Sequence, residues 1–237
     1  MKVLFIGNSH TYFNDMPELF ARFAEMASGE KPETVMLSYG MRDLAWHWQE
    51  YFALRFNLLY GGYDYCVFQQ AAHPYPPAES TLEYGKKIID LCRRVQTVPV
   101  VYMTWAEERL PENQQKMIDI CRRLASEGAL LAPIGEVWQA VRRECPDIKL
   151  YYGDGEHAGV YGVFLIAAVL CRLLTGRLPQ DVSGIGLDFL QGMTVDLDHD
   201  PAVIEDKDRI PVPLDKEKTD RILAVIRKMM PEEGKGT

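Results

Sequence analysis

Residues 3–11 read VLFIGNSHT, and this stretch decides the fold class. Its first part is a short run of β-branched, aliphatic and aromatic residues, which is typical of a buried strand. Gly7 ends the run, and the small turn that follows places the Ser9 hydroxyl at the end of the strand, where a helical segment begins. A strand that leads directly into a helix is the unit from which parallel sheets are built.

The same alternation continues along the chain. Further strands are predicted at 33–38, 64–70, 98–104 and 129–134. Helical patterns follow at 15–28, 43–59, 80–96, 112–126, 135–143, 158–174 and 215–230. Five strands without hairpin signals imply an α/β protein, with a parallel sheet that is covered by helices on both faces.

The chain has 237 residues, with no internal repeat and no convincing linker. We therefore expect a single domain over 1–237, with a core of about 1–178 and an irregular segment and helix over 179–237. The net charge of −8 argues against a nucleic-acid partner and, more weakly, against an anionic membrane surface. Five dispersed cysteines, no signal-peptide pattern and no run long enough to span a bilayer predict a soluble, cytoplasmic protein.

The residues at strand ends are the candidates for a site, because ligands of such sheets bind beyond the carboxyl ends of the strands. Ser9 follows the first strand, and Asp154 stands three residues before His157 late in the chain. A carboxylate at that spacing can hold one imidazole nitrogen and leave the other free, which is the base that a serine nucleophile needs. Taken singly, Ser9 could be a turn residue, and the step after Asp154 could be only a turn.

Several segments together resemble the SGNH (GDSL-type) hydrolase superfamily, and more narrowly its DUF4886 branch. The segments are GNSHT at 7–11, DYCVFQQ at 64–70, MTWA at 103–106 and DGEH at 154–157. Asn8 stands where the usual motif has Asp. The likeness runs from the first strand to about residue 179.

This resemblance implies a flavodoxin-like three-layer α/β/α sandwich with strand order 2-1-3-4-5. It also implies a triad with Ser9 as nucleophile, His157 as base and Asp154 as orienting carboxylate. The oxyanion hole would combine the Ser9 backbone N–H with Gly40. The superfamily's Asn after the third strand is missing, so the amide of Gln69 or Gln70 is the candidate for the third donor.

His10, His73 and Trp105 lie near predicted strand ends and are candidates to line a substrate pocket. His10 could also be a loop residue, and His73 could pack on the prolines that follow it. Acidic residues and a histidine at 196–200 suggest a metal cluster at first sight, but their spacing is not diagnostic. We expect neither a metal nor a cofactor, and the sequence indicates no oligomer.

The predicted function is hydrolysis of an ester through an acyl-Ser9 intermediate, with a small acyl group such as acetyl on a carbohydrate or similar polar alcohol. An alternative is a weak or inactive module that binds a carbohydrate or small molecule on the same scaffold, which the missing Asn favours. A nucleotide or phosphate binder is a weaker alternative, since the chain has no glycine-rich phosphate loop.

Overall fold

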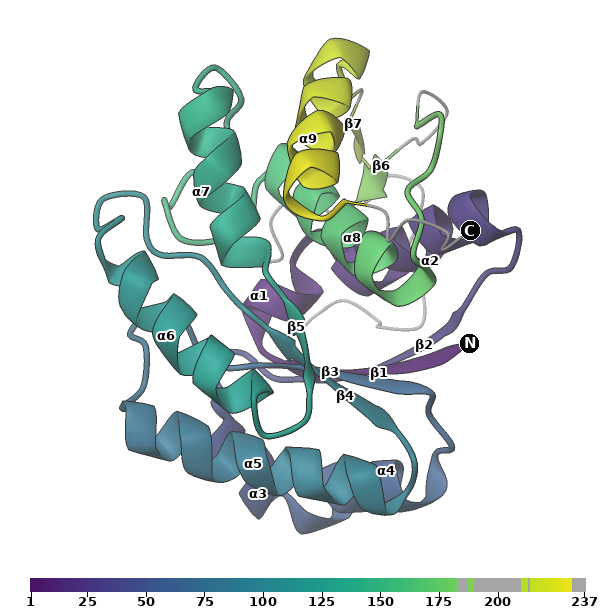
Figure 1. Ribbon diagram of the computed structural model, residues 1–237, viewed down its shortest axis with the longest axis vertical. Helices are drawn as coiled ribbons and strands as arrows, with labels where there is room; N and C mark the ends of the chain where they lie inside the picture. The colour runs from purple at the N-terminus through teal and green to yellow at the C-terminus, as the bar shows by residue number, and fades with distance from the viewer. Residues whose placement is uncertain (183–186, 190–209, 213, 232–237) are drawn as a thin grey trace.

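The computed structural model describes residues 1–182, 187–189, 210–212 and 214–231 (Figure 1). A five-stranded parallel sheet forms its centre, in the order β2-β1-β3-β4-β5. The strands are β1 (Lys2–Gly7), β2 (Glu33–Ser38), β3 (Tyr65–Gln69), β4 (Val98–Tyr102) and β5 (Leu130–Ala132). The predicted strands, their parallel pairing and their order are confirmed.

Helices cover both faces of the sheet, which confirms the three-layer α/β/α arrangement (Figure 1). One face carries α2 (Met16–Ser28), α7 (Ile134–Glu144), α8 (Val160–Thr175) and α9 (Lys216–Met229). The opposite face carries α3 (Leu44–Gln49), η2 (Tyr51–Arg55), α4 (Phe56–Tyr60), α5 (Ala78–Arg94) and α6 (Asn113–Ala125). Between β1 and α2 lie the short helix α1 (Ser9–Tyr12) and the 3₁₀ turn η1 (Phe13–Asp15).

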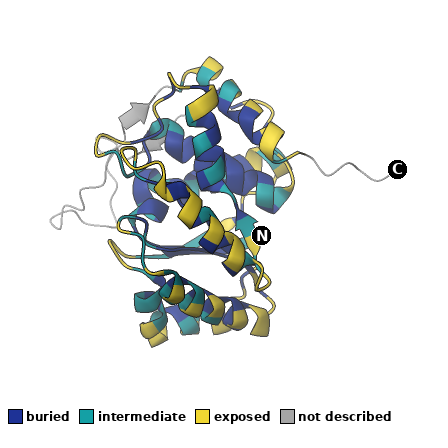
Figure 2. Cartoon of the chain, turned by 60° about the vertical axis from the view of Figure 1, so that its left-hand side comes forward, coloured by how far each residue is buried: buried dark blue, intermediate teal, exposed yellow. Residues whose placement is uncertain are grey.

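Side chains of β1 alternate between two separate hydrophobic clusters. Val3 and Phe5 contribute to the cluster beneath α2, α7, α8 and α9, whereas Leu4 and Ile6 contribute to the cluster on the opposite face. All four are fully buried, and Figure 2 shows the buried residues gathered in the sheet and on the inner helix faces. A strand that is apolar on both sides can be stable only between two covering layers, which is why the opening stretch predicts the fold class.

The predicted helix over 43–59 is three pieces, α3, η2 and α4. In an uninterrupted α-helix, Tyr51 and Arg55 would lie on the same side as the buried Leu44. The five-residue π turn η2 changes this register, so that Leu54 and Leu58 are buried and Tyr51 is exposed. The prediction of one continuous helix was wrong because the 3.6-residue period does not anticipate a π turn.

The C-terminal part begins after α8. Two short antiparallel strands, β6 (Leu187–Phe189) and β7 (Ile210–Val212), lie in the segment that the sequence predicts to be irregular. Helix α9 packs on α7 and α8 and buries Ile222 and Ile226 in their cluster. In the parts of the chain that the structure describes, no helix combines the length and the apolarity required to cross a membrane.

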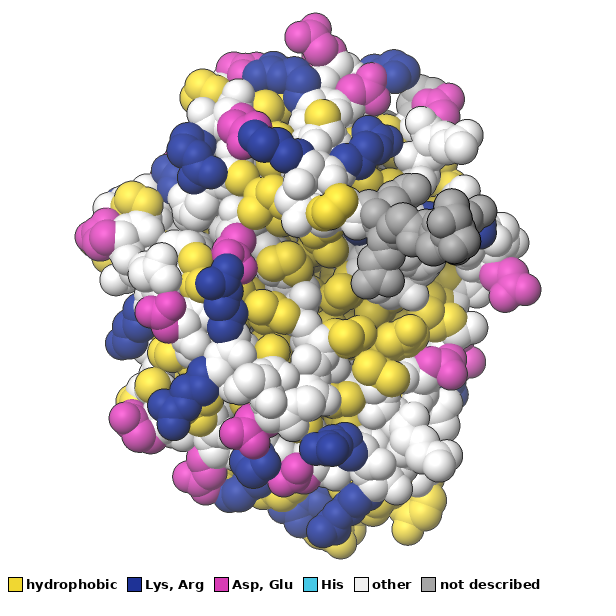
Figure 3. All heavy atoms as spheres, viewed as in Figure 1, with side chains coloured by type: hydrophobic (Ala, Val, Ile, Leu, Met, Phe, Trp, Pro, Cys, Tyr) yellow, Lys and Arg dark blue, Asp and Glu magenta, His cyan; other side chains and the backbone are white. Residues whose placement is uncertain are grey.

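Charged side chains of both signs are interspersed on the face seen in Figure 3. All five cysteines are buried and free of disulfides, as the sequence predicts. Burial raises the pKa of the Cys121 thiol to about 12 and that of the Cys171 thiol to about 11. These thiols therefore stay protonated near neutral pH and act as apolar core groups.

Gly162 on α8 tests the close packing of this helix. A Cβ at this position would collide with the Leu150 carbonyl oxygen and would lie 2.6 Å from the Trp138 ring. We expect Gly162→Ala to lower the free energy of unfolding by about 1–3 kcal/mol, measured by urea denaturation, because overpacking outweighs the better helix propensity of alanine. Gly153→Ala is the matched control, since a Cβ there meets nothing within 4 Å. Equal stability of the two variants would contradict this packing.

Candidate active site

Ser9 lies at the carboxyl edge of the sheet, where β1 passes into α1. Asn8 caps this short helix, since its side-chain oxygen accepts a hydrogen bond from the His10 N–H at 3.1 Å. The Asn8 amide nitrogen donates to the Arg42 carbonyl at 3.1 Å, which ties the turn to the loop after β2. A buried amide with partners at both ends fixes the direction in which the next residue points.

Gln69, the last residue of β3, fixes the same turn from the neighbouring strand. Its side-chain oxygen accepts hydrogen bonds from the Asn8 N–H at 3.1 Å and from the Thr11 hydroxyl at 3.0 Å. Its amide nitrogen donates to the Gln70 carbonyl. Gly7 leaves room for this arrangement, because a Cβ there would collide with Thr11 and Gln69.

The loop between α7 and α8 folds His157 back toward Asp154. One oxygen of Asp154 accepts hydrogen bonds from the backbone N–H groups of Glu156 at 2.9 Å and His157 at 3.0 Å. Gly155 has a φ of 74°, a left-handed conformation that glycine adopts without steric cost. The turn and the carboxylate–histidine pair suggested by the sequence are therefore the same feature.

Ser9, His157 and Asp154 form a continuous chain of hydrogen bonds. The Ser9 hydroxyl oxygen lies 2.8 Å from Nε2 of His157, and Nδ1 of His157 lies 2.6 Å from the second oxygen of Asp154. Residues 148 positions apart thus meet at hydrogen-bond distance. Acceptance of the Nδ1 proton by Asp154 leaves Nε2 free to take a proton from the Ser9 hydroxyl.

The surroundings of Asp154 keep it ionised. Partial burial tends to raise the pKa of its carboxyl group, but hydrogen bonds from the Glu156 N–H and from the ring and N–H of His157 outweigh that effect. The pKa of Asp154 is therefore lower than its usual 3.8. A carboxylate that is charged across the neutral range can hold the imidazole in one tautomer and orientation.

The backbone N–H groups of Ser9 and Gly40 have no hydrogen-bond partner in the described part of the chain. Gly40 follows β2 and lies beside α1, since a Cβ on it would be 3.3 Å from the Tyr12 hydroxyl. The glutamine amides have different roles. The Gln70 oxygen accepts from the N–H groups of Leu44 and Ala71, and its nitrogen donates to the Thr81 hydroxyl at 2.9 Å. Gln69 and Gln70 therefore both hold the surrounding structure, each with one hydrogen bond from its amide nitrogen, and the expectation that one of them supplies the third oxyanion donor stays a prediction.

The residues predicted to line a pocket are mostly inside the protein. Trp105 is fully buried, stacks on Trp138 at 4.1 Å and donates its indole N–H to the Glu156 carbonyl at 2.8 Å. It supports the loop of His157 from within, so the prediction that it lines an open pocket was wrong: the strand end places its ring beneath the loop, not in front of it. The His73 side chain is nearly buried too, with Nδ1 3.7 Å from a Glu107 carboxylate oxygen.

His10 and a residue that the sequence analysis missed, Phe13, contact the triad itself. The His10 ring stacks on the His157 ring at 4.8 Å, and the Phe13 ring stacks on the same His157 ring at 4.7 Å. The spacing of Phe13 could have indicated that it lies near the site. Phe13 follows Ser9 by four residues in a segment expected to be helical, and residues four apart are neighbours on a helix surface. Its contact with His157 could not be predicted, because the two residues are distant in sequence.

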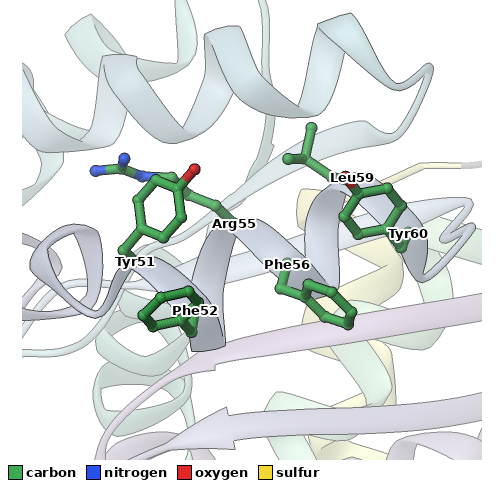
Figure 4. Close-up of a pocket in the computed structure, with 6 residues that line it drawn as sticks. All are labelled: Tyr51, Phe52, Arg55, Phe56, Leu59 and Tyr60. Atoms are coloured by element: carbon green, nitrogen blue, oxygen red, sulfur yellow. The ribbon is translucent and has the colours of Figure 1, made fainter.

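One hollow lies away from the triad. It measures about 370 Å³ and is lined by side chains of η2 and α4, drawn in Figure 4: Tyr51, Phe52, Arg55, Phe56, Leu59 and Tyr60. A second hollow of about 290 Å³ borders the triad loop and includes Asn14, Lys149, Tyr152 and Tyr161. The Tyr152 ring also contacts Phe13 at 5.3 Å, so this second hollow adjoins the triad.

Metal ligands do not cluster within the described ranges, where no three His, Cys, Asp or Glu side chains are placed to hold an ion. The acidic segment that suggested such a cluster, with Asp196, Asp198, His199 and Asp200, lies outside the described residues.

Replacement of Gln69 by methionine tests its structural role. Gln69→Met leaves the Asn8 N–H and the Thr11 hydroxyl without an acceptor, and each buried donor left unsatisfied costs about 1–3 kcal/mol. We expect a loss of that order in urea denaturation. The double variant Gln69→Met/Thr11→Val should lose less than the sum of the two single variants, because it removes one of the stranded donors. Strict additivity would show that the two side chains are not coupled.

The lowered pKa of Asp154 predicts how its contribution varies with pH. A carboxyl group whose pKa falls on folding stabilises the fold above its unfolded pKa, and that contribution disappears as pH falls through the folded pKa. The difference in melting temperature between wild type and Asp154→Asn should therefore be constant above about pH 5 and should shrink below about pH 4. A difference that stays the same at acid and neutral pH would contradict this assignment.

With the fold and the triad described, the chain can be compared with known proteins. No family model matches it, and no curated protein sequence matches it. Solved structures do match. A protein assigned to the SGNH hydrolases, from Slackia heliotrinireducens, superposes with a TM-score of 0.62 at 24% identity, over 73% of this chain and 98% of that one.

Two further neighbours have named activities. A lipase/acylhydrolase from Enterococcus faecalis matches with a TM-score of 0.60 at 13% identity, over 76% of this chain and 98% of that one. A catalytic mutant of an acetylxylan esterase from Geobacillus stearothermophilus matches with a TM-score of 0.60 at 10% identity, over 72% of this chain and 92% of that one. The fold of this chain is therefore the α/β fold of the SGNH hydrolases.

Proposed function

We propose that the protein is a serine ester hydrolase that works through an acyl-Ser9 intermediate. The observation that carries this proposal is the unbroken chain of hydrogen bonds from the Ser9 hydroxyl through His157 to Asp154. The geometry meets the requirements of a nucleophile, its base and the group that orients the base.

In the first step, the Ser9 oxygen attacks the ester carbonyl carbon while Nε2 of His157 takes the hydroxyl proton. The tetrahedral intermediate collapses when His157 gives this proton to the leaving alcohol. In the second step, water attacks the acyl-Ser9 ester, with His157 again accepting and returning a proton. Asp154 remains ionised throughout and stabilises the imidazolium that forms each time.

The oxyanion in this proposal is held by the backbone N–H groups of Ser9 and Gly40. Both are donors without a partner in the described chain, and both lie at the carboxyl edge of the sheet. Removal of one oxyanion donor from a hydrolase costs about 10²–10³ in rate. A hole with two donors therefore predicts slower turnover than a hole with three.

The substrate class follows from crowding and from the neighbours. Rings of His10 and Phe13 stack on His157 next to Ser9, and this crowding favours a short acyl group. The acetylxylan esterase with the same fold acts on an acetylated carbohydrate, as its name states. We therefore propose a small acyl ester, such as an acetyl group on a carbohydrate or another polar alcohol.

A second candidate is a binding module that turns over its ligand slowly or not at all. It is favoured by the missing Asn after β3, where Gln69 and Gln70 are engaged in structural hydrogen bonds. Such a module would be stabilised by a sugar ester without cleaving it.

Three further parts of the proposal rest on the sequence. The motifs after the strands favour the DUF4886 branch within the superfamily. The whole chain is proposed to be one domain, which agrees with the packing of α9 on α7 and α8. Five unpaired, buried cysteines favour a reducing compartment, so we propose the cytoplasm.

Labelling by a fluorophosphonate probe tests the nucleophile. We expect Ser9 to be modified in the folded protein, with the mass shift confined to the peptide that contains Ser9. Ser9→Ala and His157→Ala should each lower the hydrolysis of p-nitrophenyl acetate by about 10³-fold or more, since the members of such a triad act together.

Ser126→Ala is the control, because this exposed serine caps the C-terminus of α6 and its hydroxyl donates only to the Arg123 carbonyl of that helix. The Ser126→Ala variant should still be labelled at Ser9 and should hydrolyse p-nitrophenyl acetate as the wild type does. If the folded wild type is not labelled at Ser9 but is stabilised by sugar esters, the binding module replaces the hydrolase.

A further inference from the structure

Two aromatic rings stack on the imidazole of His157. The centroid of the His10 ring lies 4.8 Å away with an interplanar angle of 15°, and that of Phe13 lies 4.7 Å away at 25°. Both rings are buried, and both belong to the segment that starts with Ser9. The triad bonds use the edge of the imidazole, whereas these two contacts are made with its flat surface.

The same segment also holds the backbone beside His157. The Asn14 side-chain nitrogen donates a hydrogen bond to the Ala158 carbonyl at 2.9 Å. Asn14 and Asp15 have φ values of 55° and 50°, in the left-handed region that non-glycine residues adopt at a cost. This local reversal allows the ring of Phe13 and the amide of Asn14 to reach the same loop.

From this arrangement we propose that His10 and Phe13 are positioning residues for the base, a role that rests on the proposed function. Rotation of the His157 ring about its Cβ–Cγ bond would break the bonds to Ser9 and Asp154 together. Two flat rings stacked on the imidazole prevent that rotation without using either nitrogen. Ser9 thus lies in one short segment with the two residues that keep its base in plane.

His10 suits this position because it is uncharged. Burial lowers its pKa well below the usual 6.5, and the adjacent His157 and His73 lower it further, with a small opposing effect of Asp154. A neutral ring presents an electron-rich face to the imidazolium that forms during acyl transfer. The His10 ring is held in turn by edge contacts with Trp105 at 5.4 Å and His73 at 5.1 Å.

A purely structural role for these rings makes a different prediction. If they only filled space, leucine would serve nearly as well wherever the protein folds, and an aromatic replacement would have no special advantage. If instead they bound substrate, their removal would raise KM. Positioning of the base predicts a fall in kcat with KM unchanged and rescue by another flat ring.

The experiment compares Phe13→Leu with Phe13→Tyr, and His10→Leu with His10→Phe, in p-nitrophenyl acetate hydrolysis. We expect kcat of each leucine variant to fall about 10- to 100-fold with KM within about twofold of wild type, because small misplacements of catalytic groups cost rate in this range. The aromatic variants should stay within about threefold of wild type. Phe52→Leu is the matched control, since Phe52 is 80% exposed on η2, in the hollow remote from the triad.

Proton NMR gives a readout that needs no substrate. The Nδ1 proton of His157, hydrogen-bonded to Asp154, should give a low-field signal in wild type and in the aromatic variants, and it should broaden or vanish in the leucine variants. Loss of that signal with melting temperature preserved supports the proposal even if wild type hydrolyses no ester and only the proposed function fails. Leucine variants that keep both kcat and the signal, or folded aromatic variants that rescue neither, would overturn it. Phe13 and His10 are tested separately. If the variants of one residue do not fold, the variants of the other residue decide whether the proposal holds.

Discussion

The carbonyl oxygen of the Gln69 side chain holds the end of β3 to the turn that follows β1. It accepts from the Asn8 N–H and the Thr11 hydroxyl, on either side of Ser9 in sequence. The direction of the Ser9 hydroxyl depends on this contact, and the hydrogen bond to His157 depends on that direction. Replacement of Gly7 by any larger residue would displace Gln69 or Thr11, so this glycine is required by packing at least as much as by the turn.

Much of the fold could be predicted because its signals are local. Each strand is a short apolar run, and the double burial of β1 follows from residues that are apolar on both sides. The meeting of Ser9 with Asp154 and His157 could be predicted from two turns. Ser9 follows a strand, the turn of Asp154 and His157 follows a helix, and the two turns meet at one edge of the sheet. The pairing of Asp154 with His157 needed only their spacing.

The parts that could not be predicted depend on contacts across the chain. The π turn η2 arises because Leu54 must reach the core, which no local period indicates. The structural hydrogen bonds of Gln69 and Gln70 could not be predicted because their partners, such as Thr11 and Thr81, are distant in sequence. Trp105 was expected to line a pocket because it follows a strand end. The ring that stacks on it, Trp138, belongs to α7 and is distant in sequence.

The separation in sequence of the two halves of the site has a consequence for folding. Residues 8–15 and the β3 contact can be ordered once the first three strands pair, but Ser9 and Asn14 find their partners 148 and 144 residues later. Ordering contacts of such long separation is slow, since most of the chain must be closed into a loop first. Re-formation of the Ser9–His157 hydrogen bond on refolding would therefore report the docking of α8 and its preceding loop, whereas burial of Tyr102 in β4 would report an earlier event. Formation of the site therefore requires the completed fold.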